Sequence, residues 1–262
     1  MQILLIYLSA GALAGMLAGL LGVGGGIVIV PVLVFVFSLQ GIAAEVSVHL
    51  AIGTSLATIV ATAVSSIRAH HRRGAVLWPV FQRLAPGIVV GALAGAVVAD
   101  LMSSDSLRRV FGGFAVLVSL QMAFSRRPQV QRELPGPLGL AAVGVFIGGV
   151  SALVGIGGGA LSVPFMSWCN IAMRNAVATS AATGLPIAVA GAVGFIVTGW
   201  GEEGLPPFAT GFVYWPAFLG IVGMSALVAP LGARVAHSVP TTALKRFFAA
   251  FLGVVGVKML IG

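Results

Sequence analysis

The chain has 262 residues, of which 59% are hydrophobic and only 8% are charged, and its formal net charge is +8. Soluble domains are about a quarter charged, so this composition excludes a water-soluble enzyme or binding domain. The positive charge does not indicate nucleic-acid binding, because the basic residues lie in short loops between apolar runs, as in membrane proteins. Four stretches without Asp, Glu, Lys or Arg each reach the roughly 20 residues that cross a bilayer core: 1–44, 134–173, 175–201 and 204–233.

The first apolar run, residues 3–39, is too long for one crossing. A helix of that length spans about 50 Å, whereas the bilayer core is about 30 Å thick. Gly22 and Gly24–Gly26 lie at its middle, where glycine weakens a helix. We therefore predict two helical pieces, broken at the glycines, that either cross twice or form a re-entrant hairpin. Three ordinary spans follow, at 46–67, 79–101 and 107–124.

The rest of the chain predicts a second unit of the same design. Its long apolar run is broken around Gly155–Gly159, and its ordinary spans are predicted at 176–198, 212–235 and 242–261. We predict an all-α integral membrane fold made of two repeats, each a glycine-broken helix pair or re-entrant hairpin plus three transmembrane helices. The expected division is a first repeat at 1–128, a cytoplasmic linker at 129–134 and a second repeat at 135–262.

The duplication is visible in the residues themselves. The run Gly22–Pro31 recurs as Gly155–Pro164, an offset of 133 residues. The offset changes only between apolar runs, where loops are expected, and a chance match would not hold one offset over a whole span. The later matches are Thr54 and Leu56 with Thr183 and Leu185 at an offset of 129, and Trp78-Pro79 through Met122 with Trp215-Pro216 through Met259 at an offset of 137.

The loop charges favour an inverted arrangement of the two repeats. If each long run crossed once, the repeats would be parallel and the basic residues would divide evenly, six on each side. If each long run enters and returns, or crosses twice, ten basic residues share one side against two on the other, which the positive-inside rule favours. Both termini are then non-cytoplasmic. The ten are Arg68, Arg72, Arg73, Arg126, Arg127, Arg132, Arg174, Arg234, Lys245 and Arg246, and the two are Arg108 and Arg109.

The paired glycine runs point to an anion site. A helix that begins inside the membrane presents free N–H groups and a partial positive charge, and both attract anions. Glycine lets the backbone approach a ligand, and transporters with inverted repeats bind substrate at such broken helices. Close helix packing is the alternative use of these glycines. The candidate substrate-binding residues are Gly24, Gly25, Gly26, Thr54, Ser55, Gly157, Gly158, Gly159, Ser180 and Thr183.

Other polar residues are weaker candidates. His49 could relay a proton, and Asp100 or Glu45 could take part in ion coupling, although each is also an ordinary interfacial group. Cys169 has no second cysteine to pair with inside the chain. The sequence shows neither a His/Cys cluster for a metal nor a buried catalytic set, so no cofactor and no catalytic residue are expected.

The motifs resemble those of the sulfite exporter TauE/SafE family of membrane permeases. The resemblance rests on the duplicated Gly-x-Gly-Gly-Gly-x4-Pro runs, on Ile52 to Leu56, and on His71 to Trp78. It covers nearly the whole chain and implies transport of small sulfur-containing anions such as sulfite, sulfonates or related organic acids. The second half departs from the first at Thr183-Gly184, where the first has Thr54-Ser55.

The leading functional hypothesis is a permease or exporter for a small anion in the bacterial plasma membrane. The alternatives are a structural or accessory membrane subunit and, with little support, an intramembrane enzyme. The expected partners are the substrate anion and the lipid bilayer, without nucleic acid. Homo-oligomer formation, the coupling ion (proton or sodium) and the direction of transport stay open.

Overall fold

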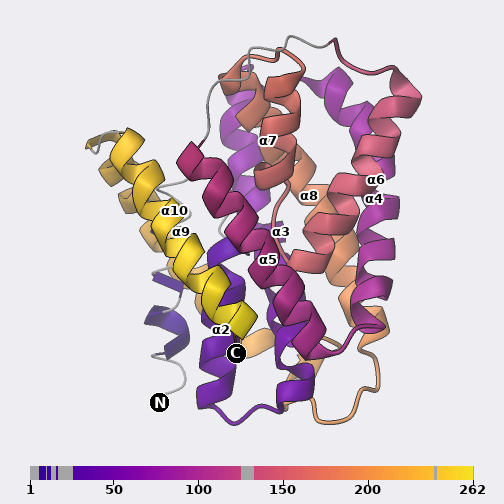
Figure 1. The fold of residues 1–262 in the computed structure, drawn as a ribbon, viewed down its shortest axis with the longest axis vertical. Helices are drawn as coiled ribbons and strands as arrows, with labels where there is room; N and C mark the ends of the chain where they lie inside the picture. Colours follow the sequence, from indigo (N-terminus) through magenta and orange to yellow (C-terminus); the bar gives the residue numbers. More distant parts are fainter. Residues whose placement is uncertain are drawn as a thin grey trace.

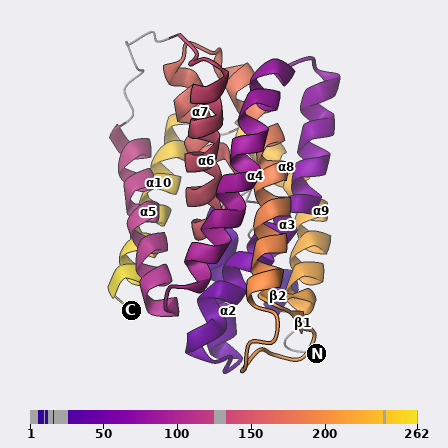
Figure 2. The ribbon, with the colours of Figure 1, turned by 90° about the vertical axis from the view of Figure 1, so that its right-hand side faces the viewer.

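The computed structural model describes residues 6–9, 11–12, 16, 26–124, 133–238 and 241–261, with the backbone alone at 229–238 and 241–245. The described chain is a bundle of helices (Figures 1 and 2). Residues 129–132 of the predicted linker at 129–134 lie outside the described residues. The helices are α2 (Gly26–Leu39), α3 (Ala44–Arg72), α4 (Trp78–Asp100), α5 (Ser104–Phe124), α6 (Pro137–Val154), α7 (Gly159–Trp168), α8 (Met173–Thr198), α9 (Trp215–Ser238) and α10 (Thr241–Ile261).

These bounds confirm the all-α membrane class. In the described part of the chain, α3, α4, α5, α6 and α8 are long and apolar enough to cross a membrane. All six ordinary spans predicted from the sequence correspond to helices. The helix starts also follow the repeat: α4 begins at Trp78 and α9 at Trp215, and α5 begins at Ser104 and α10 at Thr241. Both pairs are 137 residues apart, the offset found in the sequence.

Two short strands form a feature that the sequence did not indicate. Strand β1 (Ala209–Thr210) pairs antiparallel with β2 (Val213–Tyr214), with Ala209 opposite Tyr214. Gly211, in the turn, has φ +51°, a left-handed conformation that glycine adopts without strain. The hairpin joins α8 to α9 at the lower end of the bundle in Figure 2, where the buried Phe212 packs on His49 near the start of α3 and on Phe195 near the end of α8.

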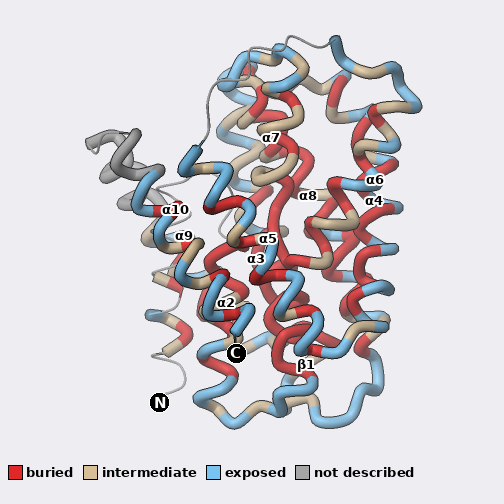
Figure 3. Tube along the Cα trace, viewed as in Figure 1, coloured by how far each residue is buried: buried red, intermediate tan, exposed pale blue. Residues whose placement is uncertain are grey.

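Helices α3 and α8 form the centre of the bundle. In each, 56% of the residues of the apolar stretch are buried, against 33 to 44% in α4, α5 and α6. Figure 3 shows the outer helices with exposed faces, as expected where lipid covers them. Helices α3 and α8 pack side by side and run in opposite directions: α3 ends where α8 begins, at the upper end of Figure 1.

Glycines bring α4 and α6 into close contact. A Cβ at Gly91 would lie 2.1 Å from the carbonyl oxygen of Val145, and a Cβ at Gly148 would lie 2.2 Å from that of Ile88. Small residues allow such close approach between membrane helices, and here they act in packing alone. The alternative explanation of the glycine content therefore holds for this pair of helices.

The chain direction agrees with an inverted arrangement without establishing it. Helices α2 and α3 are joined at the lower end of Figure 1, whereas α7 and α8 are joined at the upper end. The first long run is described only in part, so the inverted repeat and the division at 1–128 and 135–262 stay predictions.

Candidate functional site

The second long apolar run is broken at its glycines. Helix α6 ends at Val154 and α7 begins at Gly159, near mid-height of the bundle in Figure 1. Gly155 adopts φ +68°, and the N–H of Ile156 donates to the carbonyl of Ser151 at 3.0 Å, which satisfies one carbonyl at the end of α6. Residues 155–158 are buried, and non-helical backbone at membrane depth is tolerated in such surroundings.

The start of α2 packs directly on this break. A Cβ at Gly26 would lie 2.6 Å from the carbonyl oxygen of Gly155 and 2.9 Å from the Cα of Ile156. Both distances are too short for any side chain, so Gly26 is required by the contact. The two glycine runs, 133 residues apart in sequence, therefore meet at this point. Gly24 and Gly25 lie outside the described residues.

Helix α3 supplies buried hydroxyls to the same region. Ser55 Oγ donates to the carbonyl of Gly155 at 2.8 Å, so its proton is bound to the break itself. Thr54 Oγ1 accepts from the N–H of Tyr214 at 2.9 Å, and Thr58 Oγ1 donates to the Ser55 carbonyl at 2.7 Å. All three hydroxyl side chains are fully buried. In this state Ser55 holds the break in place and Thr54 holds the β-hairpin.

The start of α7 faces hydroxyls from α7 and α8. The point where Gly158 would carry a Cβ lies 3.0 Å from both Ser162 Oγ and Thr183 Oγ1, and these two oxygens are 3.4 Å apart. Thr183 Oγ1 also donates to the carbonyl of Ser180 at 2.9 Å. Gly184 brings no side chain, and its would-be Cβ is 3.9 Å from the nitrogen of Gly158. The sequence reasoning missed Ser162, although it lies one turn into α7.

The predicted residues thus fall into two groups around one break. Gly26 and Ser55 contact its first residue, whereas Gly158 and Thr183 lie together at the start of α7. Gly157 lies between them, with its would-be Cβ 3.7 Å from the side chain of Ile59. Gly159 is the first residue of α7, Thr54 faces the β-hairpin, and Ser180 contributes its carbonyl rather than its hydroxyl to the contacts described above.

Comparison with known proteins identifies the family. A model of the sulfite exporter TauE/SafE family matches residues 7–259. The chain belongs to the TauE/SafE sulfite exporter family. A probable membrane transporter protein of Haemophilus influenzae is 36% identical over 98% of both chains. Others are found in Bacillus subtilis (28% identical, covering 97% of this chain and 96% of the relative) and Methanocaldococcus jannaschii (26%, covering 98% and 95%). No solved structure is significantly similar to the chain.

The protein is therefore a membrane transporter of the TauE/SafE family. The family description and the names of its relatives indicate a transporter rather than an enzyme. In the part of the chain that the structure describes, no group of three or more His, Cys, Asp or Glu side chains lies together as a metal site would require. The start of α7 in this TauE/SafE transporter carries backbone N–H groups beside the hydroxyls of Ser162 and Thr183.

The hydrogen bonds correct the register of the duplication in the central helices. The N–H of Leu77 donates to Thr179 Oγ1 at 2.9 Å, as that of Tyr214 donates to Thr54 Oγ1, and Leu77 and Tyr214 are 137 residues apart. The bond from Thr183 to Ser180 likewise repeats the bond from Thr58 to Ser55. The matching segments, 125 residues apart, are therefore Thr54-Ser55-Leu56-Ala57-Thr58 and Thr179-Ser180-Ala181-Ala182-Thr183.

At these residues the predicted offset of 129 is thus about one helical turn too long, whereas the starts of α3 and α8, at Ala44 and Met173, keep it. Single matches at Thr54 and Leu56 supported it, while the Thr-Ser-x-Ala-Thr pattern common to both helices would have given the correct value. The apparent departure at Thr183-Gly184 disappears, because the transporter carries the same hydroxyl pattern in both α3 and α8.

In the part of the chain that the structure describes, most charged residues lie near the two ends of the bundle. The end where α3 finishes and α8 begins, called the basic end, carries Arg68, Arg72, Arg73 and Arg174; Arg174 Nη2 donates to the carbonyl of Arg73 at 2.9 Å. The opposite end, called the acidic end, carries five carboxylates, and there Asp105 binds both Arg108 and Arg109, at 2.6 and 2.7 Å. The five carboxylates are Glu45, Asp100, Asp105, Glu202 and Glu203.

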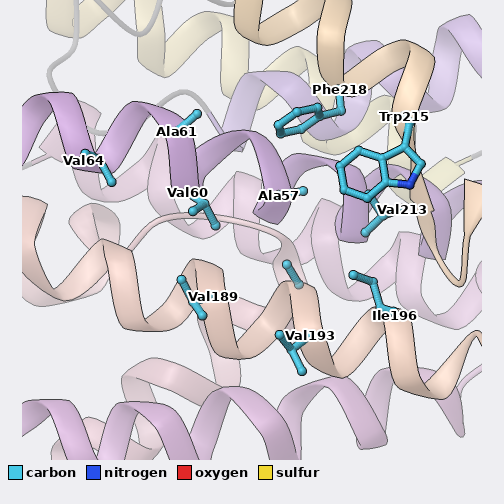
Figure 4. A pocket seen from close by; sticks show the side chains of 11 residues that line it. Ala57, Val60, Ala61, Val64, Val189, Val193, Ile196, Val213, Trp215 and Phe218 are labelled. Atoms are coloured by element: carbon cyan, nitrogen blue, oxygen red, sulfur yellow. The ribbon is translucent and has the colours of Figure 1, made fainter.

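An apolar groove between α3 and α8 is a separate feature. It encloses about 480 Å³ and is lined by aliphatic side chains such as Val60 and Val193, with Trp215 and Phe218 at one end (Figure 4). The indole Nε1–H of Trp215 donates to Thr210 Oγ1 at 2.9 Å. Its lining offers an anion no donor, so this groove is not the candidate substrate site.

Proposed function

We propose that this transporter carries a small anion of the sulfite or sulfonate class, or a related sulfur-containing organic anion, and binds it where α7 begins. The supporting observation is that Gly158 and Gly159 start a helix inside the buried core, next to the hydroxyls of Ser162 and Thr183. The substrate class comes from the family, whose description names sulfite export.

The chemistry of such an anion fits these groups. Its oxygens accept hydrogen bonds on several sides, and the first N–H groups of a helix have no intrahelical acceptor. A helix start stabilises an anion by up to about 2 kcal/mol in partly buried surroundings. The Ser162 hydroxyl adds a donor without adding a fixed charge, so the anion is not held too tightly to leave. The Thr183 hydroxyl donates to the Ser180 carbonyl in this state and becomes a donor to the anion when it rotates away from that carbonyl. Glycines at 157–159 let the anion reach the backbone.

Transport requires the site to open. In this state the hydroxyls of Ser162 and Thr183 are packed against Gly158, so the substrate enters when the α6–α7 hairpin moves away from α8. By the sequence offset of 133, Gly24–Gly26 correspond to Gly157–Gly159, so we expect the first glycine run to supply the matching half of the site in the inverted arrangement. Motion of one repeat against the other around a fixed site is how transporters of this architecture alternate access.

The charge distribution supports one orientation in the plasma membrane. The basic end faces the cytoplasm and the acidic end faces outward, in accord with the positive-inside rule. Both termini then lie on the non-cytoplasmic side; this is supported by Tyr7, whose hydroxyl donates to Gln40 in the connection between α2 and α3 at the acidic end, at 2.7 Å.

The test is flux of labelled sulfite, sulfoacetate and sulfate into proteoliposomes, together with thermal unfolding in the presence of each anion. Wild-type protein is expected to move at least one of these anions and to unfold at a higher temperature in its presence. Gly158→Ala, whose Cβ meets the two hydroxyls, is expected to lose both effects. Gly113→Ala, where a Cβ meets no atom within 4 Å, is the matched control. A protein that neither moves nor binds any of them is a non-transporting subunit, and the proposal fails.

A further inference from the structure

His49 occupies a buried position that the candidate site does not use. It lies on α3 near the acidic end and is 4% exposed. Its Nε2 is 2.9 Å from the carbonyl oxygen of Ala99 in α4, and its Nδ1 is 3.1 Å from Ser104 Oγ, the first residue of α5. The ring also packs on Phe212, with the ring centres 5.0 Å apart and a tilt of 31°. Three neighbouring elements therefore hold one titratable side chain.

The donors and acceptors around His49 define the protonation state of its ring in which all these hydrogen bonds are made. A carbonyl oxygen only accepts, so Nε2 must carry a hydrogen to bind Ala99. Ser104 Oγ donates its single proton to the carbonyl of Glu45 at 2.5 Å, so toward His49 it can only accept. Nδ1 must then carry a hydrogen as well. The full set of bonds exists with the doubly protonated imidazolium, and the neutral ring has to give up one of them.

The surroundings are suited to a cation. Ala99 lies in the last turn of α4, where the helix dipole is negative, and the face of Phe212 attracts a positive charge. The titratable or charged groups that the adjoining elements bring to this end are Glu45 (α3), Asp100 (α4), Asp105 with its partners Arg108 and Arg109 (α5), Glu202 and Glu203 (the loop after α8) and Tyr214 (β2).

The β-hairpin connects His49 to the buried hydroxyl groups of α3. The ring of Phe212 covers His49, while its carbonyl oxygen lies 2.2 Å from the would-be Cβ of Gly53, one residue before Thr54. Two residues after Phe212, the N–H of Tyr214 donates to Thr54 Oγ1. A rearrangement at His49 thus displaces the same short hairpin that binds Thr54, next to Ser55 and the break.

We propose that His49 is the proton-binding residue that couples anion transport to proton movement. The proton enters from the acidic end, completes the bonds to Ala99 and Ser104 and fixes α3 against α4 and α5. Its release frees the Ser104 hydroxyl to rotate toward Nδ1, which breaks the bond to Glu45 and loosens α3 from α5. This inference rests on the proposed function in that a substrate anion must move with the proton.

The first test measures protons and anion together in proteoliposomes, with a pH-sensitive dye inside and labelled substrate outside. For one coupled proton, a pH gradient of about one unit accumulates the anion about tenfold over an uncoupled carrier. The expected result is a constant proton-to-anion ratio in wild-type protein that falls toward zero in His49→Gln. Ser104→Ala, which removes the acceptor of Nδ1, is expected to lower the ratio as well. His71→Gln, at an exposed histidine that accepts a bond from Trp78 Nε1, is the control and keeps the wild-type ratio.

The second test does not depend on transport. Nitrogen-15 spectra of histidine-labelled protein, with His49→Gln for assignment, are expected to show a His49 ring with both nitrogens protonated in the proton-bound state and with one nitrogen protonated after proton release. If wild-type protein moves no anion, the proposed function fails while these spectra still decide whether His49 binds the proton. A His49 ring that stays singly protonated at every pH, or a His49→Gln variant with the wild-type proton-to-anion ratio, overturns the inference.

Discussion

Replacing Gly155 with alanine tests the packing of the broken helix most sharply. The residue has φ +68°, and a left-handed conformation costs a residue with a Cβ about 1 to 2 kcal/mol. The Cβ would also lie 2.9 Å from Val30 Cγ2 and 3.1 Å from the Cα of Ile52. Because the second contact is backbone, it cannot rotate away, and such overpacking costs about 1 to 3 kcal/mol. The sum predicts that Gly155→Ala lowers the free energy of unfolding by about 2 to 5 kcal/mol.

Substitutions at two other glycines separate the conformational cost from the packing cost. Gly74 has φ +62° but no atom within 4 Å of its would-be Cβ, so Gly74→Ala carries the conformational cost alone, about 1 to 2 kcal/mol. Gly113 lies in α5 with open space and an ordinary φ, so Gly113→Ala is expected to stabilise the helix by about 0.5 to 1 kcal/mol. Reversible unfolding in mixed micelles at increasing SDS fraction measures all three. If Gly155→Ala is no more destabilising than Gly74→Ala, the break is not packed as described.

Three further predictions concern the repeat register, the contact between α4 and α6, and the orientation in the membrane. Thr54→Val and Thr179→Val each leave a backbone N–H, that of Tyr214 or Leu77, without its acceptor and should each destabilise the protein by about 1 to 3 kcal/mol. The two losses should be equal if the offset of 125 is correct, and unequal losses in the same SDS titration would argue against the register. Thr62→Val, whose hydroxyl bonds only its own helix, should change stability by less. Gly91→Ala places a Cβ 2.1 Å from the backbone of α6 and should prevent a monodisperse protein on size-exclusion chromatography, while Gly113→Ala elutes as wild type. Reporter fusions should place both termini outside the cytoplasm, and a cytoplasmic signal from either end would rule out the orientation.

The long-range design of the fold could be predicted because hydropathy and charge act over whole segments. Every ordinary span appears as a helix, and the break at Gly155–Gly159 lies where a run too long for one crossing meets residues that disfavour a helix. The family was also recognisable, because the doubled glycine run is specific. By contrast, nothing in the pattern at 209–214 distinguishes a two-residue strand pair from a loop, since its stability comes from Phe212 packing on Gly53 and not from its own sequence.

The details of the site could be predicted less well, because they depend on which residues face one another. The prediction grouped Ser55 and Thr54 as substrate donors, but the structure uses the Ser55 proton for the Gly155 carbonyl and Thr54 as an acceptor for the hairpin. Ser162 was missed because it has no counterpart in the first half, where the equivalent residue is Ile29. His49 was judged an interfacial residue, since the sequence does not show that Ala99 and Ser104 enclose it.

Binding of the substrate anion at the start of α7 is the central claim, and it can be tested directly. Direct binding of labelled sulfite or sulfoacetate to purified protein, measured for wild type, Gly158→Ala and Gly113→Ala at matched pH, addresses it without the complications of flux. We expect saturable binding in wild type and Gly113→Ala, with affinity reduced on the order of tenfold or more in Gly158→Ala, because a helix-start contact worth up to about 2 kcal/mol is lost. Equal affinity in all three proteins would contradict it.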